Sequence, residues 1–101
     1  MSECNKLIRE LGELLQTLDL RRMDIGDISR KLYGTSMRPS DFTVRFWLDL
    51  ERGLLEVRDY QVCYGPRCVD LAEVITKMRE YYELLGERRK LLRLITEACR
   101  T

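Results

Sequence analysis

The chain has 101 residues, with 18 Lys and Arg against 17 Asp and Glu, so its formal net charge of +1 does not by itself indicate a nucleic-acid binder. Its 45% of hydrophobic and 35% of charged residues are typical of a compact soluble domain and argue against disorder. The sequence has no run of 18 apolar residues, and its polar first residues, 1–6, are unlike a signal peptide. We therefore expect a single domain over residues 1–101 that is intracellular and cytoplasmic.

Two stretches of helical periodicity open the chain, and we predict that they form separate helices. The first covers residues 2–18, and the second begins near Asp24 and stops at Gly34, a residue that commonly terminates helices. The apolar positions are Leu7, Ile8, Leu11, Leu14, Leu15 and Leu18 in the first helix, and Ile25, Ile28 and Leu32 in the second.

A third helix and a hairpin are predicted next. The segment Pro39-Ser40-Asp41 carries helix-start signals, and the helix that follows ends at Gly53. Its predicted buried side consists of Val44, Trp47, Leu48 and Leu50. Residues 54–58 change to strand periodicity, and residues 60–64 and 67–71 form a predicted hairpin around Gly65-Pro66, with either a two-residue turn or a longer four-residue loop.

This order of elements resembles the winged helix-turn-helix superfamily of transcriptional regulators. The resemblance covers about half of the chain, and residues 40–55 look like the recognition helix of that family and its exit. It implies an α+β, mostly helical fold with a helix-turn-helix at 24–53 and a two-stranded wing within 54–70. One departure is Asp49, which stands where the family usually has Leu, four residues before the glycine. This departure leaves the register of the buried face open.

The last predicted helix, over residues 71–100, begins at the candidate cap Asp70 and contains Gly86, which either breaks the helix or is accommodated in it. Its apolar stripe is longer than one small core can cover. We therefore predict a homodimer to which the first helix contributes, although the helix can instead fold back within a monomer. The predicted interface residues are Leu71, Val74, Ile75, Met78, Tyr82, Leu85, Leu92 and Ile95.

The composition suggests a thermophilic source, because Arg outnumbers Lys 14 to 4 and Asn and Gln together number only three. Disulfides occur inside cells of hyperthermophiles, whereas the cysteine spacing and the lack of histidine fit zinc poorly. The hairpin places Cys63 opposite Cys68, so we predict a disulfide there, with four reduced thiols as the alternative. Cys4 and Cys99 can bond, within or between chains, if the first and last helices run antiparallel.

Catalysis is not indicated, because the sequence has no histidine, no Gly-rich phosphate loop and no nucleophile motif. We expect no cofactor, no metal and no small-molecule ligand. The winged-helix resemblance implies a homodimeric regulator that binds double-stranded DNA sequence-specifically, with the third helix in the major groove. Residues 21–67 support this with nine basic residues against seven acidic ones.

Arg45 is the candidate base reader, because Arg can pair bidentately with guanine. The other candidate DNA contacts are Arg30, Lys31, Arg38, Ser40, Thr43, Phe46, Arg52, Tyr64 and Arg67. Phe46 would either meet a thymine methyl group or pack in the core. The alternative function is protein–protein contact without DNA binding. It is favoured by the low net charge and by Asp41 and Asp49, which repel phosphate from the same helix face.

Overall fold

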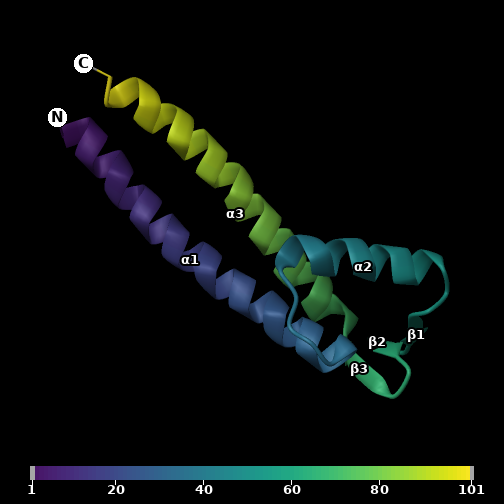
Figure 1. Ribbon diagram of the computed structural model, residues 1–101. Helices are drawn as coiled ribbons and strands as arrows, with labels where there is room; N and C mark the ends of the chain where they lie inside the picture. Colours follow the sequence, from purple (N-terminus) through teal and green to yellow (C-terminus); the bar gives the residue numbers. More distant parts are fainter. Residues whose placement is uncertain (1, 101) are drawn as a thin grey trace.

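The computed structural model describes residues 2–100 (Figure 1). One uninterrupted helix, α1 (Ser2–Tyr33), stands in place of the two helices that were predicted over 2–18 and from Asp24 to Gly34. No Gly or Pro interrupts the segment 19–23 between the two stretches. Ion pairs one turn apart, Arg22–Asp19 and Arg21–Asp24, bridge it. The prediction of a break there was wrong. The two apolar stripes are in phase and form a single stripe.

The apolar stripe of α1 packs along α3 (Leu71–Ala98), which runs antiparallel to it (Figure 1). Buried and half-buried residues alternate at spacings of three and four on both helices, which is the pattern of a coiled-coil seam. On α1 they are Leu7, Leu11, Leu14, Leu18, Arg21, Ile25, Ile28 and Leu32; on α3 they are Leu71, Val74, Met78, Tyr81, Leu85 and Arg88. Gly86 lies within α3 and does not break it. The N-cap predicted at Asp70 is confirmed, since its carboxylate accepts a hydrogen bond from the Glu73 amide.

The helix α2 (Pro39–Glu51) buries a different face from the one predicted. Phe42 and Phe46 are fully buried and stack with their ring centroids 5.6 Å apart. Val44, Trp47 and Leu48, predicted to be buried, are exposed, and of that predicted set only Leu50 is partly buried. The two phenylalanines lie one turn apart, and each places more apolar surface in the core than valine would.

Three strands follow α2 in an antiparallel sheet of order β1-β2-β3: β1 (Glu56–Arg58), β2 (Gln61–Tyr64) and β3 (Arg67–Asp70). The sheet therefore has one strand more than the predicted two-stranded wing, and this strand, β1, lies in the segment 54–58 for which strand periodicity was predicted. Tyr64 pairs with Arg67 across a two-residue turn in which Gly65 has a φ of 59°. Because Cys63 pairs with Cys68 in this register, the predicted disulfide of the hairpin is confirmed.

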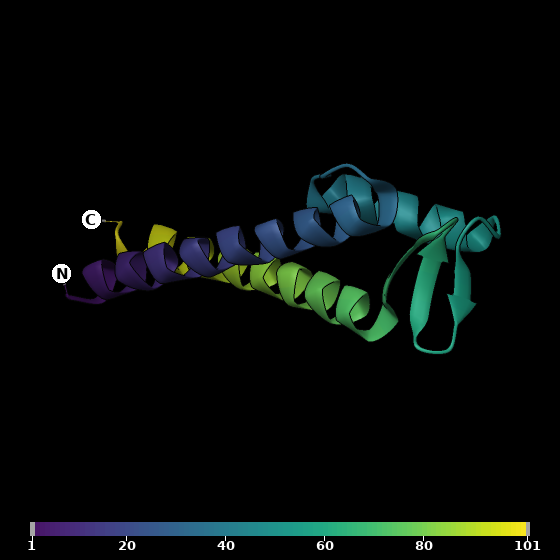
Figure 2. The same cartoon turned by 90° about the horizontal axis from the view of Figure 1, so that it is seen from below.

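The second disulfide joins Cys4 to Cys99 within one chain, with their Cα atoms 5.1 Å apart. Both residues continue the α1–α3 seam, so the bond closes the end of the molecule at which the two chain termini lie (Figure 1). The sheet lies at the opposite end (Figure 2). We call residues 2–22 and 81–98 the stalk and residues 23–80 the head.

The molecule is elongated, with extents of 57 × 22 × 20 Å and a radius of gyration of 17.3 Å, against about 13 Å for a compact domain of this length. The head contains the main core, and the stalk is a two-helix pair. The core residues are Ile25, Ile28, Leu32, Phe42, Phe46, Leu55, Val62, Val69, Val74 and Met78. None of the described helices is both long and apolar enough to cross a membrane.

Candidate functional site

The outward side of α2 carries a row of exposed apolar side chains. Val44 is 59% exposed, Trp47 51% and Leu48 39%. They face outward because Phe42, Phe46 and Asp49 occupy the opposite, buried side of the helix. Burying a large apolar side chain stabilises a protein by roughly 1.5–3 kcal/mol, so this row leaves substantial stabilisation unused in the isolated chain. Isolated exposed apolar residues are common, but a contiguous group marks a contact surface.

A hollow of about 200 Å³ lies beside Trp47, between α2 and α3. It has room for a whole side chain, since one water molecule takes about 30 Å³ in the liquid. The Tyr82 hydroxyl donates a hydrogen bond of 3.1 Å to Thr43 Oγ1, which joins the two helices at this place. The hollow is lined by Thr43, Trp47, Ile75, Met78, Arg79 and Tyr82. We call Val44, Trp47, Leu48, Ile75 and Tyr82 together the α2 face.

Arg45, the predicted base reader, takes part in a polar cluster with Tyr33 and Asp49. Its guanidinium carbon lies 4.0 Å from the centre of the Tyr33 ring, and its Nε lies 3.4 Å from Asp49 Oδ2. The Tyr33 hydroxyl donates a 2.9 Å hydrogen bond to the same oxygen. Burial, followed by the bond to Asp49, raises the pKa of Tyr33 well above its ordinary value. The cluster gives the nearly buried carboxylate of Asp49 a hydrogen-bond donor and an ion-pair partner. The sequence pattern had predicted Asp49 on the outward face of the helix.

The other predicted DNA contacts do not gather on one surface. Phe46 is fully buried in the head core, so it is not available to a thymine methyl group. Arg30 pairs with Asp27 at 3.1 Å and Arg38 with Asp41 at 3.4 Å, so carboxylates of the same chain oppose both guanidinium groups. Thr43 contacts α3, and Tyr64 is partly buried against the core, whereas Lys31, Ser40 and Arg52 are exposed.

Arg67, at the tip of the hairpin, reaches the C-terminal end of α1. Its Nη1 donates a 3.4 Å hydrogen bond to the Arg30 carbonyl oxygen. The guanidinium also covers Gly34, where an added Cβ would lie 3.2 Å from it and where φ is +81°. A cation beside the carbonyl groups of a helix C-terminus is favourable. This contact brings Arg30, Lys31 and Arg67 to the same end of the molecule.

The predicted dimer residues of α3 are covered mainly by α1 of the same chain. Val74 and Met78 are buried in the core, and Leu71, Leu85 and Ile95 are partly buried. The apolar stripe that was expected to need a second copy therefore has a partner within the chain. Tyr82 and Leu92 remain 40% and 45% exposed, and Ile75 lines the hollow beside Trp47.

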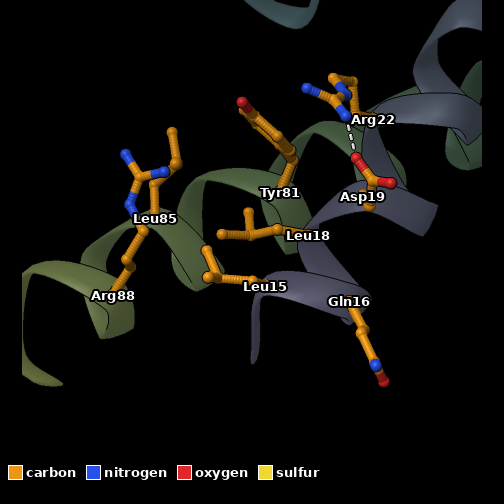
Figure 3. Close-up of a pocket in the computed structure, with 8 residues that line it drawn as sticks. All are labelled: Leu15, Gln16, Leu18, Asp19, Arg22, Tyr81, Leu85 and Arg88. Carbon is orange, nitrogen blue, oxygen red and sulfur yellow. Dashed lines mark hydrogen bonds and ion pairs between the residues drawn. The ribbon is translucent and has the colours of Figure 1, made fainter. Parts of the chain in front are cut away.

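A second hollow, of about 390 Å³, lies on the stalk near the head (Figure 3). Leu15 and Leu18 of α1 approach Tyr81 and Leu85 of α3 there, and the ion pair of Arg22 with Asp19 lies at one edge (Figure 3). Every buried side-chain nitrogen and oxygen among the described residues has a hydrogen-bond partner, so no unsatisfied polar group points to a ligand in this hollow.

Metal binding has no candidate site in the described part of the chain, where no three His, Cys, Asp or Glu side chains are grouped for it. Comparisons with models of protein families, with curated protein sequences and with solved structures found no match for this chain. Its function must therefore be inferred from its own geometry. The α2 face combines exposed apolar side chains with an adjoining hollow, so we infer the function from this surface.

Proposed function

We propose that this chain is a protein-interaction module that binds its partner through the α2 face. The observation that carries the proposal is the outward exposure of Val44, Trp47 and Leu48 from a helix that is firmly anchored in the core. Trp is among the residues that contribute most to binding energy at protein interfaces, especially beside a pocket. Trp47 lies beside such a pocket.

The electrostatics of α2 also favour a protein partner over a phosphate backbone. The segment 38–52 carries three arginines and three carboxylates, so it has no net charge. Arg38 and Arg45 are each paired with a carboxylate of α2 itself. DNA binding depends on cations that replace the counterions of the phosphates, and the carboxylates of Asp41 and Asp49 beside these two arginines repel phosphate.

An experiment that selects ligands with the protein itself tests this function. Peptides are selected by display on the immobilised full-length chain, and the clones are then compared on Trp47→Arg and Ile8→Arg. Ile8 is a matched control, since it is 50% exposed on α1 in the stalk against 51% for Trp47. We expect convergent clones that bind the original chain and Ile8→Arg but lose binding to Trp47→Arg. Clones equally affected by both substitutions, or no clones at all, would contradict the proposal.

Sequence-specific DNA binding as a homodimeric winged-helix regulator is the second candidate function. It is favoured by the order helix, short loop, helix and hairpin, and by the convergence of Arg30, Lys31 and Arg67 at the end of α1. In this case Lys31 and Arg67 would contact phosphates. A gel shift on the protein's own upstream DNA at two salt concentrations tests it. Lys31→Ala and Arg67→Ala should each weaken binding to all sequences alike. Each should also reduce the slope of log affinity against log salt concentration by about 1.

The two functions differ in what the substitutions at the end of α1 do. Lys31→Ala and Arg67→Ala leave the partner binding of a protein-interaction module through Trp47 unchanged, whereas they weaken DNA binding to all sequences. Salt-dependent, sequence-selective DNA binding by the original chain, combined with no peptide dependence on Trp47, would replace the first proposal with the second.

A further inference from the structure

We infer that the partner of the α2 face is a second copy of this chain, bound about a two-fold axis near Trp47. This inference rests on the proposed function and names its partner. A two-fold interface brings the same surface of two molecules together, so the surface has to be complementary to itself. The α2 face meets this requirement in shape and in charge.

The complementarity in shape consists of a projection and a hollow side by side. Val44 and Leu48 project from α2, each within one helical turn of Trp47, and the hollow of about 200 Å³ opens on the α3 side of Trp47. A two-fold axis near Trp47 places Val44 and Leu48 of one copy opposite the hollow of the other copy. An apolar side chain of each copy can then enter the hollow of the other, while the two Trp47 rings pack near the axis. Both copies thus bury the same apolar side chains.

The complementarity in charge comes from Glu51 and Arg79. Both are exposed, and neither makes an ion pair with any residue in the described range 2–100. Arg79 borders the hollow on α3, and Glu51 lies one helical turn beyond Trp47 toward the C-terminal end of α2. When the two-fold axis exchanges the two sides, Glu51 of each copy approaches Arg79 of the other. The dimer then gains two equivalent ion pairs that the monomer cannot form.

Sedimentation equilibrium and the fluorescence of the only tryptophan test the dimer. We expect a mass near twice 12.0 kDa at micromolar concentration, and Trp47 emission that shifts to longer wavelength on dilution. Trp47→Arg should be monomeric at micromolar concentration and should remain so at concentrations up to 100-fold higher, whereas Ile8→Arg should remain dimeric. Thermal unfolding of both variants confirms that they are folded.

Charge reversal tests the two-fold pairing itself. Glu51→Arg and Arg79→Glu should each weaken the homodimer by about tenfold, because each replaces two attractions by two repulsions at partly exposed positions. The double variant E51R/R79E should restore it. An equimolar mixture of the two single variants should also dimerise, because in the mixed dimer each reversed side chain meets its opposite on the other copy.

The outcomes separate this inference from the proposed function. If the original chain still has the monomer mass of 12.0 kDa at 100 times micromolar concentration, the inference is overturned. Selected peptides that require Trp47 would still support the proposed function in that case. A dimer that tolerates Trp47→Arg overturns the inference as well, since its interface lies elsewhere. A dimer that depends on Trp47 but is not restored by mixing the two charge variants overturns the two-fold pairing of Glu51 with Arg79.

Discussion

The two disulfides should differ strongly in what they contribute to the free energy of unfolding. Cys4 and Cys99 are separated by 95 residues along the chain, and Cys63 and Cys68 by five. A crosslink restricts the unfolded chain more when it closes a longer loop. The entropy of loop closure gives about 4–5 kcal/mol for the long loop and about 2 kcal/mol for the short one. The terminal disulfide should therefore stabilise the fold about twice as much as the hairpin disulfide.

The comparison uses Cys4→Ala/Cys99→Ala and Cys63→Ala/Cys68→Ala under oxidising conditions, with unfolding followed in urea. We expect the first variant to lose about 4–5 kcal/mol, with a melting temperature lowered by roughly 4–8 °C per kcal/mol. Alanine is chosen because Cys63 is only 1% exposed and serine would bury an additional hydroxyl group there. Thiol counting on the denatured, unreduced original chain should find no free thiol. Equal losses in the two variants, or a larger loss for the hairpin pair, would refute the loop-entropy reasoning.

Three further predictions concern the head and α3. Tyr33→Phe should lower the free energy of unfolding by about 1.5–3 kcal/mol, because Asp49 loses a hydrogen-bond donor in a nearly buried place. Since folding raises the pKa of Tyr33, its contribution to the free energy of unfolding is complete below the ordinary tyrosine pKa of 10.0 and is lost as the pH rises further. Urea titrations above pH 10 should therefore show a steeper loss of stability in the original chain than in Tyr33→Phe. Parallel curves would contradict this. Gly86→Ala should stabilise the protein by up to about 1 kcal/mol, whereas Gly53→Ala should destabilise it by a similar amount. Neither added Cβ meets an atom within 4 Å, but Gly53 has a φ of +75°, which disfavours any residue other than glycine. Melting temperatures that move in the same direction would refute the argument. Asp70→Ala should cost about 1 kcal/mol through loss of the N-cap of α3, and Asp70→Asn, which keeps an acceptor oxygen, should cost less in the same urea assay.

Local patterns in the sequence predicted the order of the elements from α2 onward and much of the sheet, but not the continuity of α1. The hairpin register followed from Gly65-Pro66, because pairing across a tight turn fixes which residues face one another. The disulfide of Cys63 with Cys68 followed from that register. The start of α3 at Asp70 was predicted equally well, since a cap acts on the backbone of its own helix.

The face that α2 buries could not be fixed in the same way. Two apolar stripes exist on this helix, Phe42 with Phe46 and Val44 with Trp47 and Leu48, and both have helical spacing. The available signal was Asp49, which stands where a buried leucine was expected. Its carboxylate is accommodated on the buried side because Tyr33 and Arg45, 16 and four residues away, supply polar contacts. Such partners become visible only in the folded chain.

The sequence by itself determined which segments form helices and strands, except for the continuity of α1 through residues 19–23. It also determined the turn that pairs Cys63 with Cys68 and the capping of α3, because each depends on residues only a few positions apart. Tertiary structure decided that α1 covers the stripe of α3, that Cys4 meets Cys99, and that Trp47 faces outward. These outcomes depend on which apolar surfaces bury one another at long range. Periodicity shows that a helix has an apolar side, but the competition among all such sides for one small core determines which of them stays exposed.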